Sequence, residues 1–155
     1  MATGDIKWIS GGLLALGSKI HDLTTDVFKL GLVTATVTPA IADTDGRWGA
    51  GGSVNYLTNE VGQVSGNYAT GGPSLASVTW TNVSSVPTFR ATDVTISQHA
   101  SNPTAARWGI IYNSTDASKR AIAFIDFGAA KDLTTGDFTT NFGGAGTDIL
   151  TLTQS

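Results

Sequence analysis

The sequence of 155 residues is long enough for one domain with a hydrophobic core, because a chain of this size buries roughly 70% of its unfolded surface. With 14% charged residues and a net charge of −3, it lacks the basic surface that nucleic-acid binding requires. It has no cysteine, which excludes disulfide bonds, thiol catalysis and cysteine metal sites. Its 23 Thr, 10 Val and 10 Ile residues against a single Glu favour β-strands over helices.

The N-terminal apolar run, residues 8–17 (WISGGLLALG), is too short to cross a membrane, since a spanning helix needs roughly 20 residues. Asp5 precedes the run and no small-x-small cleavage motif follows it, which is unlike a signal peptide. We expect residues 1–25 to form a short helix or an extended arm, covered by this domain or by a neighbour. Gly11 and Gly12 weaken the helix alternative, because each costs about 1 kcal/mol relative to alanine inside a helix.

The remaining residues, 26–155, carry the signals of short antiparallel strands. Period-two alternation of apolar and polar residues predicts strands near residues 27–33, 76–81, 93–97, 138–142 and 150–152, with a glycine turn at 143–146. Residues 34–53 contain a proline and a glycine-rich stretch and are predicted to be a long loop.

The run from Trp108 to Phe127 reads as a long hairpin. Two apolar strands flank NSTDASK at 113–119, which has the composition of a turn. Because both faces of these strands are apolar, we expect them to be central. The total of about eight strands fits two packed sheets or a closed barrel, and we predict a mainly β fold, an antiparallel β-sandwich that is jelly-roll-like.

Catalytic patterns are sparse. The two histidines, His21 and His99, are far apart in sequence and form no helix-spaced metal pair, so we expect both to be structural. Asp126 lies between two apolar residues and is either an acid with a raised pKa or the partner of Arg107 or Arg120 in an ion pair, which we favour. We therefore predict no enzyme activity, no cofactor and no metal.

A short acidic motif, Asp43, Asp45 and Gly46, matches the opening of a calcium loop. The match ends at Arg47, which stands where a third ligand oxygen is needed. We interpret the motif as a solvated Asp-Gly turn.

The four tryptophans divide into two groups. Trp80 and Trp108 alternate with core positions and are expected to be internal. Trp8 and Trp48 have no evident core position, so they are candidates for contact with a partner; the alternative is that each packs inside its own domain.

Three segments resemble a known family when they are taken together: KIHDLTTDVFKLGLV (19–33), YATGGPSLASVTWT (68–81) and WGIIYNSTDASKRAIAFIDFG (108–128). With the closing GDFTTNF and DILTL, they resemble small virion proteins of tailed bacteriophages, which carry an LSSDTFKV-like strand, a GYTAGG-like turn, a hairpin ending in IDFG and an ILTL-like strand. The resemblance spans residues 13–153 and is weakest at 34–62.

The resemblance implies a structural role in the phage particle, as a decoration (cement) protein that assembles in the bacterial cytoplasm and sits on the capsid exterior. Its partners would be the major capsid protein and copies of itself in a homotrimer, with no nucleic acid and no membrane. We expect residues 6–20 and 39–53 to make the contacts. The candidate interface residues are Trp8, Ile9, Leu13, Leu14, Asp43, Asp45, Arg47 and Trp48. The alternative is a tail or baseplate component, or a receptor- or carbohydrate-binding module that uses Trp48 with Asp43 and Asp45.

Overall fold

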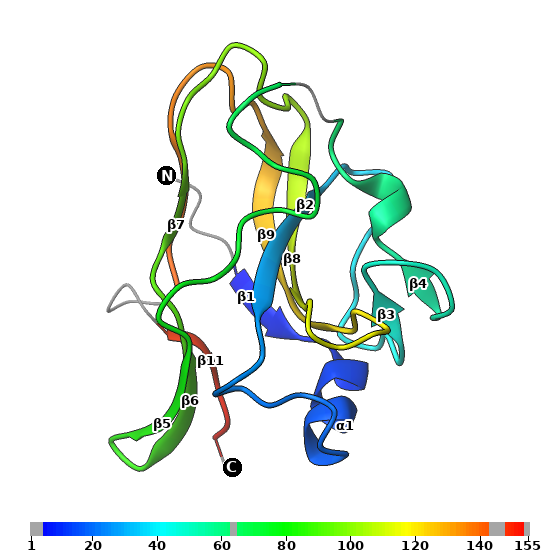
Figure 1. Ribbon diagram of the computed structural model, residues 1–155, viewed down its shortest axis with the longest axis vertical. Helices are drawn as coiled ribbons and strands as arrows, with labels where there is room; N and C mark the ends of the chain where they lie inside the picture. Colours follow the sequence, from blue (N-terminus) through cyan, green and yellow to red (C-terminus); the bar gives the residue numbers. More distant parts are fainter. Residues whose placement is uncertain (1–4, 63–64, 143–147, 154–155) are drawn as a thin grey trace.

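The computed structural model describes residues 5–62, 65–142 and 148–153, and within these ranges the protein is mainly β (Figure 1). One short α-helix, α1 (Ser10–Gly17), and one 3-10 turn, η1 (Leu57–Asn59), accompany the strands. The strands are β1 (Asp5–Trp8), β2 (Phe28–Val33), β3 (Gly46–Arg47), β4 (Val54–Asn55), β5 (Thr79–Val83), β6 (Val86–Arg90), β7 (Val94–Ile96), β8 (Ala106–Asn113), β9 (Ala121–Lys131), β10 (Phe138–Thr140) and β11 (Asp148–Thr151). The predicted glycine turn at 143–146 lies outside the described residues.

A four-stranded antiparallel sheet in the order β1-β9-β8-β2 forms the centre of the molecule. The predicted hairpin is confirmed as β8 and β9, which pair across the turn at 114–120. Successive residues of these strands are buried on opposite faces: Ile111 and Ile125 on one, Ile110 and Phe124 on the other. The expectation that the hairpin is central is therefore correct.

A second layer of strands covers one face of this sheet. It consists of two antiparallel groups, β11-β6-β5 and β10-β7, which follow one another along the chain from β6 to β7. At the end of the β10–β7 pair, the Phe142 amide donates a hydrogen bond to the Asp93 carboxylate at 2.8 Å. Edge-to-face aromatic pairs cross the interior between the layers, with Phe28 against Phe89 at 5.2 Å and Phe127 against Phe138 at 5.1 Å. The layers pack as in a β-sandwich; the predicted jelly-roll connectivity is not confirmed by these strand orders.

The long loop between β2 and η1 covers the opposite face of the central sheet. It contains only the two-residue parallel pair β3–β4, in agreement with the predicted loop. Trp48 and Tyr56 from this loop are buried in a second hydrophobic cluster with Ile9, Ile110 and Phe124. Of the two alternatives for Trp48, packing inside its own domain is confirmed and contact with a partner is wrong, because its side chain is 2% exposed.

The N-terminal segment is part of the domain rather than a separate arm. Strand β1 extends the central sheet, with Ile6 opposite Ile125 and Trp8 opposite Ala123. The predicted short helix is present as α1, which packs on the start of β9. A Cβ on Gly12 would lie 2.6 Å from the Ile122 Cα, so the glycine that weakens the helix is what permits its close approach to the sheet.

Candidate interaction surface

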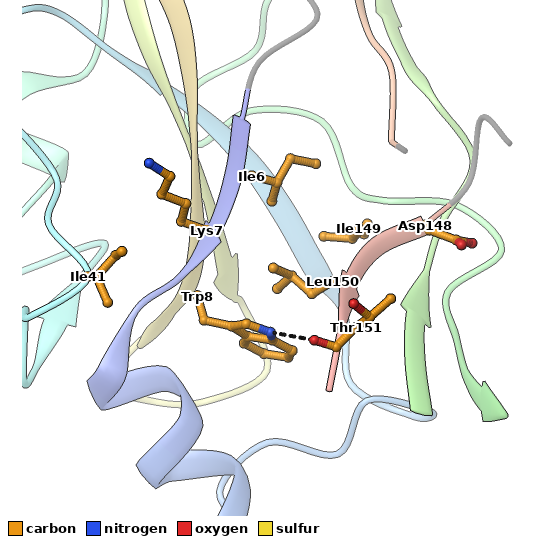
Figure 2. A pocket seen from close by; sticks show the side chains of 8 residues that line it. All are labelled: Ile6, Lys7, Trp8, Ile41, Asp148, Ile149, Leu150 and Thr151. Atoms are coloured by element: carbon orange, nitrogen blue, oxygen red, sulfur yellow. Dashed lines mark hydrogen bonds between the residues drawn. The ribbon is translucent and has the colours of Figure 1, made fainter. Parts of the chain in front are cut away.

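A groove of about 530 Å³ runs between β1 and β11, the edge strands of the two layers (Figure 2). Ile6 and Trp8 point from β1 toward β11, and the Trp8 indole Nε1 donates a hydrogen bond to the Thr151 carbonyl at 3.4 Å. On the β11 side the lining includes Ile149 and Leu150. Two segments from opposite ends of the described chain thus form one largely apolar groove.

Exposed apolar side chains line this groove and a second hollow beside α1. Ile41 lines the groove and is 57% exposed, and Leu14 on α1 is 70% exposed. Leu14 and Ile20 line a second hollow of about 260 Å³. We call Ile6, Trp8, Leu14, Ile20 and Ile41 together the N-terminal surface. Folding leaves this surface without a cover among the described residues.

Asp43 holds the loop beside α1. Its carboxylate accepts hydrogen bonds from the Tyr56 hydroxyl at 2.5 Å and the Ala40 amide at 3.1 Å, and its carbonyl accepts from the Gly11 amide at 3.0 Å. Burial, together with the Asp43 carboxylate, raises the pKa of Tyr56 well above its ordinary value. Asp43 is therefore already occupied by contacts that close the loop against the helix.

Asp45 and Arg47 form an ion pair within the loop. The Arg47 guanidinium donates from Nε at 2.8 Å and from Nη2 at 2.6 Å to the two carboxylate oxygens. The hydrogen bonds from Arg47 lower the pKa of Asp45. Arg120 lies 3.9 Å from Asp45 and 2.9 Å from Asp116. These bonds favour the turn over a calcium loop, because the Asp45 carboxylate is bound by cationic side chains.

The candidate interface residues fall into three groups. Leu14 is exposed, and two residues, Ile9 and Trp48, are buried. The half-buried residues are Trp8, Leu13, Asp43, Asp45 and Arg47. The prediction that Ile9 contacts a partner is wrong for the same reason as for Trp48. Its side chain is 0% exposed and packs in the cluster on the outer face of the central sheet. Of the eight, the structure brings Trp8 into the groove and Leu14 with Asp45 into the second hollow.

Sequence reasoning did not single out five apolar residues of these hollows: Ile6, Ile20, Ile41, Ile149 and Leu150. Ile6, Ile20 and Ile41 lie within the predicted contact ranges 6–20 and 39–53, so the sequence indicated the right segments but not these residues. Ile149 and Leu150 belong to the closing strand, and no local pattern indicates that this strand lies beside β1.

The remaining tryptophans pack partly as expected. Trp80 is half-buried against the core between the layers. Trp108 is also half-buried; it lies edge-on to Phe124 at 6.2 Å, and the Arg107 guanidinium sits 4.0 Å from its ring centroid. Both contact core clusters while part of each side chain reaches the surface.

The candidate acid Asp126 is engaged in a salt bridge. The Arg107 guanidinium donates to its carboxylate, and the Gly128 amide donates to the same oxygen at 2.7 Å. The hydrogen bond from Arg107 lowers the pKa of Asp126, whereas an acid catalyst would need it raised. The ion-pair interpretation is confirmed, with Arg107 as the partner.

Both histidines have structural contacts. His21 is buried beside Asn113, and the exposed His99 accepts a hydrogen bond from the Ser101 amide at 3.0 Å. Within residues 5–62, 65–142 and 148–153, no group of three or more His, Cys, Asp or Glu residues is placed to hold a metal ion.

No family model, curated protein or solved structure matches this chain. In the part of the chain that the structure describes, no helix has the length and apolar character to span a bilayer.

Proposed function

We propose that this protein is a structural component of a tailed-bacteriophage particle, a decoration (cement) protein that binds the head exterior and bridges capsomers. Its partners are the major capsid protein and copies of itself in a homotrimer. The segments at 19–33, 68–81 and 108–128 that resemble small phage virion proteins support this assignment.

The N-terminal surface is the observation that carries the proposal. Ile41 and Leu14 are large apolar side chains that are more than half exposed; Ile41 lines the groove with Ile6 and Trp8, and Leu14 lines the second hollow. Exposed apolar side chains that gather beside a groove are typical of protein–protein contact sites. A protein that binds the assembled lattice more tightly than the free subunits stabilises the lattice by linkage, and several subunits bridging together add avidity.

A receptor- or carbohydrate-binding role in the tail receives no support from the residues that suggested it. Trp48 is buried and cannot stack on a sugar. Asp43 and Asp45 accept hydrogen bonds from Tyr56 and Arg47, so their carboxylates are not directed to a ligand. A tail location is therefore an outcome of the test below rather than a second proposal.

The test is localisation and rebinding. Antibody-gold labelling of purified particles is expected to place the protein over the head. Heads that lack the protein are expected to bind the added wild-type chain. The double variant Leu14→Asp, Ile41→Asp should lose at least about tenfold in affinity, because each apolar side chain contributes about 1.5–3 kcal/mol when it is buried.

The control variant is Leu57→Asp, which changes an apolar residue that is 39% exposed on η1, outside the N-terminal surface. It should bind heads as the wild type does. Deletion of residues 1–18 is a poor test, because it removes β1 and the buried Ile9 and so damages the fold. Absence from particles, label at the tail tip, or unchanged binding by the double variant would overturn the proposal.

A further inference from the structure

His21 is buried where the segment between α1 and β2, residues 18–27, meets the turn between β8 and β9. Its side chain is 4% exposed, and its Nδ1 lies 3.1 Å from the Asn113 side-chain nitrogen. Three further hydrogen bonds tie the same segment to the turn. The Val27 amide donates to the Thr115 hydroxyl at 2.9 Å, and the Val27 carbonyl accepts from the Ser114 amide at 2.8 Å and the Ser114 hydroxyl at 2.9 Å. The segment is thus fastened at its end and at His21.

The hydrogen bonds of Asn113 determine which ring nitrogen of His21 carries the proton. The Asn113 side-chain oxygen accepts from the Thr115 amide at 2.9 Å and from the Asp116 amide at 3.1 Å. Its nitrogen therefore faces the other way, and donates to the Asp26 carboxylate at 2.6 Å and to His21 Nδ1. Because Nδ1 has to accept this bond, the imidazole is neutral, with its hydrogen on Nε2.

Protonation of His21 would place a second N–H at Nδ1, opposite a donor. Rotation of the Asn113 amide does not relieve the conflict, because the amide nitrogen would then face the Thr115 and Asp116 N–H groups. The Nε2 atom is buried without a hydrogen-bond partner among the described residues, so a positive charge on the ring is not solvated from that side either. The site accommodates only the neutral ring.

We propose that His21 is an acid-sensitive latch: uptake of a proton at Nδ1 breaks the bond to Asn113 and loosens residues 18–27 from the β8–β9 turn. This inference does not depend on the proposed function. It identifies a conformational control of the segment that connects α1 to β2.

The charged groups around the ring oppose one another. Asp26 on the segment itself and Asp116 on the turn favour the protonated ring, and Arg120 on the same turn disfavours it. Phe28 on β2 presents an apolar edge at 6.2 Å. Burial is the largest influence and lowers the pKa of His21 below its ordinary value of 6.5.

The direction of the pH effect follows from this lowered pKa. The loosened segment, in which the ring is hydrated, takes up a proton near pH 6.5, whereas the latched ring resists it. The latched state is therefore fully favoured above about pH 6.5 and loses stability as the pH falls below that value. The opening constant is expected to rise by up to about tenfold for each pH unit between 6.5 and the lower pKa of the latched ring.

The experiment uses the full chain with His99→Gln. This substitution replaces the other histidine of the sequence, which is exposed. The single imidazole NMR signal then belongs to His21 and is expected to titrate with a midpoint below 6.5. Amide hydrogen exchange between pH 5 and 8, corrected for intrinsic rates, should show opening of residues 18–27 and 113–116 that grows as pH falls. The β8 amides at 108–111 serve as an internal reference and should stay protected.

A second variant, His21→Gln, separates protonation from a general effect of acid. Its side-chain oxygen can accept the bond from Asn113 but takes up no proton, so exchange of residues 18–27 should not depend on pH. If this variant fails to fold, the titration and exchange in His99→Gln still decide the question. A His21 midpoint at or above 6.5, or equal pH dependence in residues 18–27 and 108–111, would overturn the latch.

Discussion

The Trp48 ring lies flat on the Tyr112 ring, with the centroids 4.9 Å apart and the planes 2° from parallel. The ring also lies over Gly31, where a Cβ would come within 2.2 Å of the indole Cη2. A tryptophan in a glycine-rich loop thereby becomes part of the core on the outer face of the central sheet. The loop is thus anchored by a large buried side chain, and its stability is coupled to that of β2 and β8.

We expect Trp48→Ala to lower the free energy of unfolding by about 3–5 kcal/mol, because it removes a fully buried aromatic side chain and leaves a cavity over Tyr112. Urea denaturation followed by circular dichroism measures the loss. Leu14→Ala, at a position 70% exposed, is the control and should change the free energy by no more than about 0.5 kcal/mol. A loss below about 1 kcal/mol in Trp48→Ala would show that the ring is not a core residue in solution.

Gly31→Ala tests the close approach of the ring to β2. The added methyl group overlaps the indole, so we expect a loss of about 1–3 kcal/mol by overpacking. In a Trp48→Ala background the space is vacant, and the same substitution should cost less. A double-mutant cycle from four urea denaturation curves measures this coupling. If the two losses simply add, the ring does not lie over Gly31.

The central hairpin could be predicted from the sequence because its signal is local: two apolar runs flank a polar turn, and both faces of each strand are apolar. The burial of Trp48 could not. Its neighbours in the loop are glycines and polar residues with no periodicity, and the residue that it covers, Tyr112, lies 64 positions along the chain. Its position is determined by a distant contact rather than by its own segment.

Part of the candidate surface could likewise be predicted from the sequence, and part could not. Leu14 could be found because it belongs to an apolar segment with low helix propensity, which has to pack against another surface. Ile41 lies in a loop that the glycine-rich composition predicts. The opposite wall, Ile149 and Leu150, could not be found, because only the pairing of β11 with β6 brings it beside β1. Which edge strands of the two layers lie side by side depends on the order of strands in each sheet, and local sequence patterns do not specify that order.

Gly12→Ala and Gly17→Ala are a matched pair on α1. A Cβ on Gly12 would meet the Ile122 Cα at 2.6 Å and the Ala121 carbonyl oxygen at 2.9 Å, whereas one on Gly17 meets nothing within 4 Å. We expect Gly12→Ala to destabilise the protein by about 1–3 kcal/mol, because the helix has to move away from β9. Gly17→Ala should be neutral or stabilise by up to about 1 kcal/mol, since alanine is the better helix former. Thermal unfolding compares the two; equal midpoints would show that α1 does not pack this closely.

The three tyrosines of the chain, Tyr56, Tyr68 and Tyr112, are all buried, and this predicts an unusual response to alkali. Burial raises the pKa of each hydroxyl; that of Tyr112 rises to about 12, and Tyr56 and Tyr68 rise further, with Asp43 and Glu60 as their carboxylate neighbours. A group whose pKa is raised in the folded state stabilises the fold fully below its unfolded pKa, here 10.0, and this stability is lost as the pH rises above that value. Because of these three hydroxyls, the free energy of unfolding is expected to be about 4 kcal/mol lower at pH 11 than at neutral pH.

Absorbance at 295 nm, which reports tyrosinate, tests this directly. At pH 11 the folded protein should show at most about a tenth of the tyrosinate signal of the same protein in concentrated urea, where the hydroxyls titrate near 10. As the pH rises further, the remaining signal should appear together with the loss of circular dichroism, because ionisation of Tyr56 and Tyr68 requires unfolding. A tyrosinate signal that develops with a midpoint near 10 while the circular dichroism is unchanged would mean that these hydroxyls are solvated in the native state, and would contradict the packing of the loop around Tyr56.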